Sequence, residues 1–269
     1  MDAERAWYHR AMGEPQRKYL IDLDDPRAPS QEAWDRMTPA ERAEVVESLP
    51  SEFPVSEAAP PEGDTHFEAV VRARDVLRGF FRRSGQRVWI ANNLPVYYPQ
   101  EKMFSPDVIA VVDTDVRSRE HWTVSAEGKG LDVAIEILWS GRRKKDLKDN
   151  VERFARLGIP EYFIFDRKKL RLLGYRLPTP EARVYQPILP QLGAHLSERL
   201  GLGLGVEGDK LRFYVGGASL PESAELIAQL DAKLSAAEAH AEEEARRAEE
   251  AERQLAEALA ELAKLRRGN

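Results

Sequence analysis

The sequence predicts an α/β fold followed by a long C-terminal coiled-coil helix. Short apolar segments of strand length alternate with amphipathic segments of helical period, which is the pattern of an α/β domain. Two apolar segments, 103–112 and 131–138, have the β-branched composition of strands buried on both faces. Near residue 221 a seven-residue repeat begins. We therefore expect an N-terminal helical and extended arm over 1–63, a globular domain over 64–220 and a coiled-coil helix over 221–269.

The composition is that of a globular protein with a charged appendage. Of the 269 residues, 42% are hydrophobic and 8% aromatic, which is enough for a substantial core, while 32% are charged. Residues 222–269 hold 12 acidic and 7 basic side chains, so the rest of the chain is nearly neutral. Any nucleic-acid binding by the globular part must therefore rely on a local basic patch.

Several classes of protein are excluded by residues and spacings that the sequence lacks. The chain has no cysteine, which excludes disulfides, thiolate zinc sites and cysteine nucleophiles. Its histidines lack ligand spacing, and the glycine-rich segment 201–206 lacks the strand-to-helix context of a dinucleotide loop. The N-terminus has no apolar export segment, and no apolar run is long enough to span a membrane. We expect a cytoplasmic protein with no membrane contact and no small-molecule cofactor.

The N-terminal part predicts helices joined by extended chain. Residues 30–49 have the pattern of a short helical pair, and the prolines between 54 and 61 favour extended backbone. An amphipathic helix is predicted from about Thr65 to Ser84, because its apolar residues recur at helical spacing. Thr65 and Glu68 have the spacing of a capping box, and a glycine follows the helix directly.

The middle of the chain predicts most of the strands and a second long helix. This helix, about Lys144–Leu157, is indicated by apolar residues at helical spacing and by the stop signal Gly158-Ile159-Pro160. The expected strands are 88–91, 96–98, 107–112, 122–125, 131–138, 162–165 and 170–177, followed by a hairpin of 203–206 and 211–215.

The C-terminal segment has the heptad pattern of a coiled coil. The a positions are Ile227, Leu234, Ala241, Ala248, Leu255 and Leu262, and the d positions are Leu230, Ala237, Glu244, Ala251, Ala258 and Leu265. The seam is rich in leucine at both ends and in alanine at its centre. We expect a long helix that joins two copies of the chain as a homodimer. The alternative is a solvated helix without a partner.

Two carboxylates lie in the apolar segments that predict buried strands. Asp107 follows Pro106 at the start of one segment, and Glu136 lies between two isoleucines in the other. An ionised carboxylate in a buried strand is costly unless it is paired or binds a cation. Two of them on neighbouring strands predict an oxygen-ligand site for Mg²⁺ or Mn²⁺. The alternatives are that Asp107 only caps a turn and that Glu136 faces solvent from an edge strand.

A basic segment follows the second carboxylate. Five of the seven residues from 142 to 148 are basic, namely Arg142, Arg143, Lys144, Lys145 and Lys148. They lie at the start of a predicted helix, where the macrodipole favours acidic residues, so helix stability does not explain them. Contacts with nucleic-acid phosphates would explain them. The alternative is a solvated basic loop.

The order of these motifs resembles a known family. A Pro-Asp pair, a glutamate late in a strand, a Lys/Asp-rich helix and the sequence Gly-Ile-Pro-Glu-Tyr-Phe-Ile-Phe-Asp over 158–166 are similar to the Uma-two family, whose members are described as restriction endonucleases of the PD-(D/E)XK nuclease superfamily. The resemblance covers roughly residues 64–180. It implies a restriction-endonuclease-like mixed sheet flanked by helices, with Asp107 and Glu136 as ligands of a divalent metal. It also places Glu68 where many superfamily members have a further acid.

The resemblance is incomplete at the catalytic lysine. The superfamily pattern expects lysine two residues after the glutamate, where this chain has Leu138. The Uma-two pattern instead expects lysine in the following helix, where this chain has Asn150, whose amide carries no charge. Lys145 and Lys148 are therefore the candidate catalytic lysines, with Lys129 before the strand as a further alternative.

These residues predict a metal-dependent nuclease that hydrolyses phosphodiester bonds, with DNA as the expected substrate. The metal ligands are predicted to be Asp107, Glu136 and Glu68. Arg142, Arg143 and Lys144 are predicted to contact the DNA backbone. The alternative function is a catalytically impaired protein of the same fold that binds nucleic acid or acts as a coiled-coil interaction module.

Overall fold

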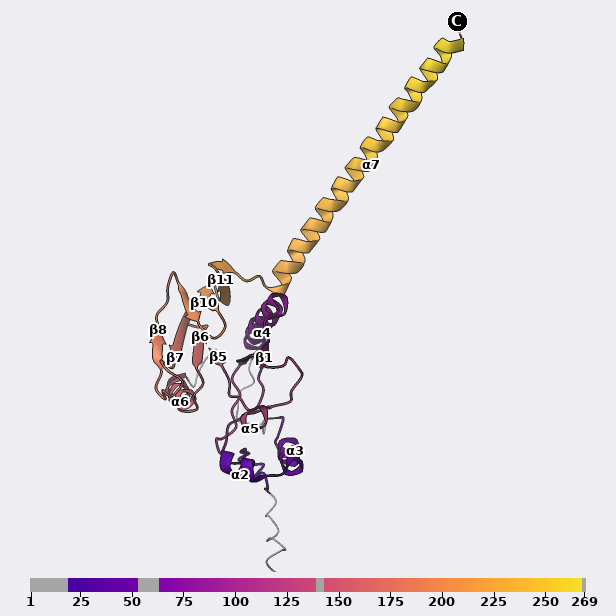
Figure 1. Cartoon of the computed structure of the whole chain (residues 1–269). Helices are drawn as coiled ribbons and strands as arrows, with labels where there is room; N and C mark the ends of the chain where they lie inside the picture. The colour runs from indigo at the N-terminus through magenta and orange to yellow at the C-terminus, as the bar shows by residue number, and fades with distance from the viewer. Residues whose placement is uncertain (1–18, 53–62, 139–142, 268–269) are drawn as a thin grey trace, which may run out of the picture. The chain divides into compact units, whose positions relative to one another are not determined.

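The structure is a computed structural model that describes residues 19–52, 63–138 and 143–267, except for the side chains of 143–147, 264, 265 and 267 (Figure 1). The chain divides into two compact units, Met1–Leu220 and Pro221–Asn269. Within the described residues, no helix is both long and apolar enough to cross a membrane.

The helices of the first unit begin and end at identifiable capping residues. Ser30 caps α2 (Gln31–Arg36) by accepting a hydrogen bond from the backbone of Ala33. A capping box of Thr38 and Glu41 begins α3 (Pro39–Ser48), with proline at its first position. These two helices form the helical pair predicted over 30–49. The short α5 (Val124–Glu127) ends at a left-handed glycine.

The first long helix, α4 (Asp64–Ser84), begins one residue earlier than the sequence predicts. Its N-cap is Gly63, which provides no side-chain hydrogen bond. Thr65 therefore lies within the first turn, and the predicted capping box of Thr65 and Glu68 is wrong. At the other end Gly85 adopts a positive φ of 72°, so the predicted glycine stop is confirmed.

The main sheet has six strands in the order β1-β3-β5-β6-β7-β8. Their bounds are β1 (Val88–Asn92), β3 (Val108–Val112), β5 (Val133–Leu138), β6 (Glu161–Asp166), β7 (Arg171–Arg176) and β8 (Gln186–Ile188). Only β5 and β6 run parallel in this sheet, and α6 (Arg143–Arg156) makes the crossover between them. The predicted mixed α/β fold with flanking helices is therefore confirmed (Figure 1).

Two smaller sheets complete the first unit. One pairs β2 (Val96–Tyr97) with β4 (Trp122–Thr123) in parallel. The other has the order β12-β11-β10-β9. Its strands are β9 (Ala194–Ser197), β10 (Leu202–Glu207), β11 (Lys210–Val215) and β12 (Ala218–Ser219). The predicted hairpin is β10 with β11, whereas the strand predicted over 122–125 is wrong in its second half, where the chain enters α5 instead.

The main sheet separates two apolar clusters. The side chains of β5 alternate between them, because successive residues of a strand point to opposite faces. Ile135 and Ile137 pack in the cluster that contains α4 and the β10–β11 hairpin, whereas Ala134 packs with Phe154 of α6. Both faces of the sheet are thus covered, which explains why its central strands read as continuous apolar runs.

The second unit contains the long helix α7, Ser223–Arg267, which has 45 residues. A long C-terminal helix is therefore confirmed. Its alanine, glutamate, lysine, arginine and leucine residues are strong helix formers.

Candidate active site

Asp107 directly precedes β3, and Glu136 lies within the neighbouring antiparallel strand β5. The last register pair between β3 and β5 is Val108 with Ile135, and the two carboxylate residues come one position beyond it on each strand. Asp107 is buried, with 7% of its surface exposed, and Glu136 is half-buried. The two acids that the sequence predicts as a pair therefore come from one end of this strand pair.

Both oxygens of Asp107 are held by hydrogen bonds. Oδ2 accepts from the backbone N–H of Ile137 at 2.6 Å. Oδ1 lies 3.2 Å from Nε2 of His66 on α4. The strand ladder has ended at this point, so the carboxylate satisfies a backbone donor that would otherwise be unpaired. These contacts fix the orientation of the carboxylate between the sheet and α4.

His66 is the site residue that the sequence analysis missed. It is 5% exposed and lies on the same face of α4 as the core residues Val70 and Ala73. A search for pairs of metal-binding histidines cannot find it, because its partner is an aspartate 41 residues away. The usable signal is a polar residue at helical spacing within an apolar stripe.

Glu68 does not join the two carboxylates. It is exposed on α4 and lies about 200° around the helix from His66, which faces the sheet. Among the described residues, no group of three or more histidine, aspartate and glutamate side chains is placed to hold a metal ion.

The donor set nevertheless fits a hard divalent cation. Mg²⁺ is commonly held by one or two carboxylates, with water and substrate phosphate oxygens completing its shell, rather than by a full protein cage. Asp107 and Glu136 provide such a pair of oxygen donors. His66 beside Asp107 then corresponds to the group that orients a metal-binding carboxylate in many such sites.

The basic residues are only partly placed by the structure. Arg142 lies outside the described residues, and so do the side chains of Arg143, Lys144 and Lys145 at the start of α6. Lys148 is exposed, with Nζ 3.8 Å from Oε1 of Glu152 one turn further along the helix.

Lys129 lies away from the carboxylate pair. Its Nζ is 3.0 Å from Oδ2 of Asp132 and donates to the backbone oxygen of Val112. Val112 is at the far end of β3 from Asp107. Asp132 also interacts with Arg199. Lys129 and Asp132 therefore stabilise the opposite end of the strand pair.

Asn150 and Tyr162 belong to the surroundings of Glu136. Burial and the negative charge of Glu136 raise the pKa of the Tyr162 hydroxyl well above its usual value, and the Asn150 amide offsets part of that rise. The hydroxyl is buried and makes no hydrogen bond of normal geometry with the described residues. Asn150 on α6 thus lies close to the Tyr162 hydroxyl, and it occupies the position where the resemblance expects lysine.

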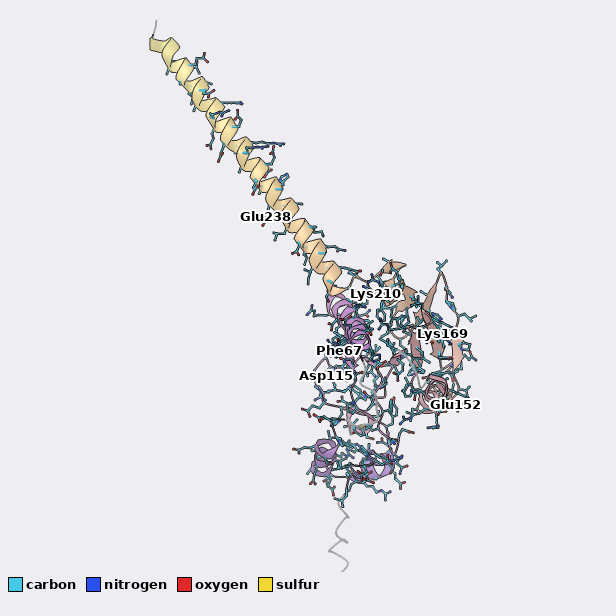
Figure 2. The ribbon with its side chains drawn as sticks, turned by 180° about the vertical axis from the view of Figure 1, so that it is seen from behind. Phe67, Asp115, Glu152, Lys169, Lys210 and Glu238 are labelled. Atoms are coloured by element: carbon cyan, nitrogen blue, oxygen red, sulfur yellow. The ribbon has the colours of Figure 1, made fainter. Side chains whose placement is uncertain are left out.

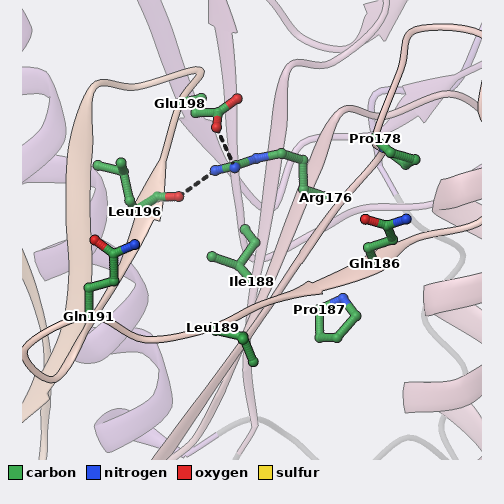
Figure 3. A pocket seen from close by; sticks show the side chains of 9 residues that line it. All are labelled: Arg176, Pro178, Gln186, Pro187, Ile188, Leu189, Gln191, Leu196 and Glu198. Atoms are coloured by element: carbon green, nitrogen blue, oxygen red, sulfur yellow. Dashed lines mark hydrogen bonds and ion pairs between the residues drawn. The ribbon is translucent and has the colours of Figure 1, made fainter.

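A separate pocket lies over β7, β8 and the β8–β9 connection. It is lined by Arg176, Pro178, Gln186, Pro187, Ile188, Leu189, Gln191, Leu196 and Glu198 (Figure 3). Within it Arg176 donates to Oε1 of Glu198 at 2.6 Å and to the backbone oxygen of Leu196 at 2.5 Å. None of the residues predicted for the metal site lines this pocket.

Comparisons with known proteins agree with the resemblance seen in the sequence. Residues 55–212 match the family model described as "Uma2: Putative restriction endonuclease", a longer span than the predicted 64–180. Among solved structures, the chain is similar to a protein from Anabaena variabilis described as a "putative nuclease". The identity is 11% and the TM-score 0.41, over 53% of this chain and 76% of that chain. The comparison with curated proteins finds no match.

Proposed function

The chain belongs to the Uma2 family, and from this premise we propose that it is a nuclease that uses Mg²⁺ or Mn²⁺ to hydrolyse phosphodiester bonds in DNA. The observation that carries the proposal is the position of Asp107 and Glu136 on adjacent strands, with both Asp107 oxygens oriented by hydrogen bonds. A buried aspartate that is oriented by hydrogen bonds, with a half-buried glutamate on the neighbouring strand, offers hard oxygen donors of the kind that Mg²⁺ binds.

The residues around the two carboxylates each have a proposed role in the site. Asp107 and Glu136 would hold the ion, which when bound polarises a phosphate oxygen and lowers the pKa of water. His66 would act as a positioning residue, because its Nε2 faces Oδ1 of Asp107 rather than an open space. The Ile137 N–H donates to the other oxygen and limits rotation of the carboxylate.

The cationic part of the site would come from the start of α6. Lys145 or Lys148 would stabilise the charge that develops on the phosphate. Arg142, Arg143 and Lys144 would contact the flanking DNA backbone. Glu68, being exposed on α4, fits a peripheral role better than a third metal ligand.

A second candidate function is binding of nucleic acid without efficient cleavage. It is favoured by Asn150, a neutral amide close to Tyr162 at the position where a lysine is expected. A protein of this kind would keep the phosphate-binding residues and the fold and would lack the charge needed in the transition state.

A homodimer would suit a nuclease that cuts duplex DNA, because one active site cuts one strand at a time. We assign this pairing to α7, whose heptad seam provides a face for a second copy.

Cleavage of DNA by the purified full-length chain tests the proposal. Supercoiled plasmid, single-stranded DNA and RNA are incubated with Mg²⁺ or Mn²⁺, and the wild type is compared with Asp107→Asn, Glu136→Gln and the surface control Asp209→Asn. We expect divalent-metal-dependent cleavage that falls by at least about 100-fold in the first two variants and is unchanged in the control.

Thermal unfolding with and without metal provides a second readout. Metal should raise the melting temperature of the wild type and of Asp209→Asn, but not that of Asp107→Asn. Metal-dependent stabilisation and DNA binding without any cleavage would favour the second candidate function. If metal neither stabilises the wild type nor supports cleavage of any substrate, the nuclease proposal is wrong.

A further inference from the structure

The helix α7 carries an unusual number of exposed large apolar side chains. Its leucines and its one isoleucine lie mainly at the two ends of the heptad seam, where they are between 55% and 64% exposed. These are Ile227, Leu230, Leu234, Leu255, Leu259 and Leu262. Charged side chains surround the seam along the whole helix, as Figure 2 shows around Glu238. An apolar stripe on an otherwise charged helix is the pattern of a surface that binds another helix.

The charges that flank the seam select how a second helix would pair with it. In a parallel coiled coil in register, each g residue faces the e residue that lies five positions further along the partner helix. Lys233 would then face the partner's Glu238, Arg247 the partner's Glu252, and Glu261 the partner's Arg266. Each of these pairs joins opposite charges, and the two-fold symmetry forms each pair twice.

An antiparallel pairing places like charges together. With the two helices fully overlapped, e residues face e residues and g residues face g residues. Glu238 would then face the partner's Glu252, and Arg247 would face the same residue of the partner. Lys233 with Glu261 is the main attractive pair that this arrangement offers. Like-charge pairs at flanking positions disfavour an arrangement, so the charge pattern favours the parallel one.

Three seam residues affect the number of strands and the stability of the parallel arrangement. Ile227 at an a position followed by Leu230 at a d position is the combination that favours two strands. Glu244 occupies a d position at the alanine-rich centre, so in register it would face its own copy. That contact weakens the centre of the coiled coil, and it leaves the two leucine-bearing ends as the main apolar contacts.

We propose that α7 binds a second copy of this chain as a parallel, in-register, two-stranded coiled coil. The pairing depends only on α7. Its consequence for cleavage rests on the proposed nuclease function. Because both helices start at Ser223 on the same side, both nuclease units are attached at one end of the coiled coil. In an antiparallel pair they would be attached at opposite ends of a helix about 68 Å long, from 45 residues at about 1.5 Å each. The parallel arrangement therefore keeps the two first units tethered at the same end of one coiled coil, which suits cleavage of both strands of one duplex.

Disulfide cross-linking tests the orientation directly, because the chain has no cysteine of its own. Leu230→Cys and Ala258→Cys each place one cysteine at a d position near one end of the seam. Under mild oxidation each variant should form a covalent dimer with itself. Ala232→Cys, at the outward f position, is the matched control and should remain uncross-linked at the same protein concentration.

The opposite orientation gives a different result. In an antiparallel pair Leu230 lies beside Leu262 of the other chain, so Leu230→Cys and Leu262→Cys would cross-link when mixed, and Leu230→Cys would not cross-link alone. That result overturns the proposal. So does a monomeric, trimeric or larger mass of the wild type in analytical ultracentrifugation.

Charge and seam variants test the register. Lys233→Glu should weaken dimerisation roughly three- to tenfold, and the double variant with Glu238→Lys should restore it. Glu244→Ala should tighten the dimer, because it removes the contact between like charges at the centre. Unchanged dimerisation in all three variants contradicts the register. None of these measurements uses nuclease activity, so they can succeed or fail independently of the proposed function.

Discussion

Nε2 of His66 lies 3.2 Å from Oδ1 of Asp107, and this contact ties the first turn of α4 to the start of β3. Both side chains are buried. The contact links the residue with the strongest sequence evidence for catalysis to one that sequence analysis did not select. It therefore provides the first prediction about how the site works.

Replacing His66 tests its role as a positioning residue. His66→Ala should lower the rate of cleavage by roughly 10- to 100-fold and raise the metal concentration needed for half-maximal activity, because Asp107 loses one of its orienting contacts. His66→Gln should recover part of both, since its amide nitrogen can occupy a position like that of Nε2. Titration of metal against initial cleavage rate provides the measurement. Equal loss in both variants, with unchanged metal dependence, would indicate a purely structural role.

Position 150 holds asparagine where the family pattern has lysine, so a positive charge expected in the catalytic site is missing there. Asn150→Lys introduces an ammonium group at the position where the family pattern has lysine, and it should raise the cleavage rate by roughly 10-fold or more, because a positive charge there would stabilise the charge that develops on the phosphate. Lys148→Met is the companion variant. Lys148 is exposed and its Nζ lies 3.8 Å from Oε1 of Glu152, so we expect its removal to have a small effect, which would assign the charge-stabilising role to Lys145. A plasmid-nicking assay compares the two, and no gain from Asn150→Lys would show that the site does not need a lysine there.

A buried ion pair should contribute strongly to the stability of the first unit. Glu161 is fully buried and accepts hydrogen bonds from Nε of Arg176 at 3.0 Å, from the backbone of Glu198 at 2.8 Å and from the hydroxyl of Ser197. Glu161→Gln should lower the free energy of unfolding by about 2–4 kcal/mol, since it leaves Arg176 with reduced compensation.

The control for this prediction is a substitution of the second acidic residue that contacts Arg176. Glu198 is mostly exposed and also contacts Arg176, within the pocket of Figure 3. Glu198→Gln should cost less than about 1 kcal/mol. Urea unfolding followed by circular dichroism measures both variants. If the two variants lose the same amount of stability, burial does not set the strength of this ion pair.

Acidification should destabilise the protein through its buried histidines. Burial lowers the pKa of His195 below the ordinary value of 6.5, although a backbone hydrogen bond to Leu204 opposes the shift. The unfolded chain therefore binds a proton at His195 more readily than the folded chain does. The contribution of neutral His195 to the free energy of unfolding is fully present above about pH 6.5, and it is lost as the pH falls through the lowered pKa of His195 in the folded chain. Burial lowers the pKa of His121 in the same direction.

Melting temperatures between pH 5 and pH 8 measure this effect. His195→Gln should reduce the fall in melting temperature between pH 7 and pH 5. His240→Gln, at an exposed position on α7, should leave the dependence of melting temperature on pH unchanged. The same slope in all three proteins would exclude His195 as a source of the pH dependence.

The long regular elements were predictable from the sequence, whereas some of the short ones were not. The strand β5 and the helix α6 have continuous apolar composition or clear helical spacing, and both were found within one or two residues of their predicted bounds. The strand β8 has only the residues Gln186, Pro187 and Ile188, none of them buried, so its pattern carries no signal of a strand. The strand β8 forms because it pairs with β7 at the edge of the main sheet, and this pairing is not visible in the residues of β8 themselves.

The sequence by itself determined the long elements, the heptad pattern of 227–265 and the positions of the two carboxylates in apolar segments, because periodicity and composition act over short distances along the chain. Only the tertiary structure decided which groups surround Asp107. It brought His66 to this carboxylate from 41 residues away and placed Lys129 at the far end of β3. It also placed Asn150 near the Tyr162 hydroxyl. Such contacts depend on how α4 and α6 pack on the sheet, and packing between distant segments leaves no periodic signal in the sequence.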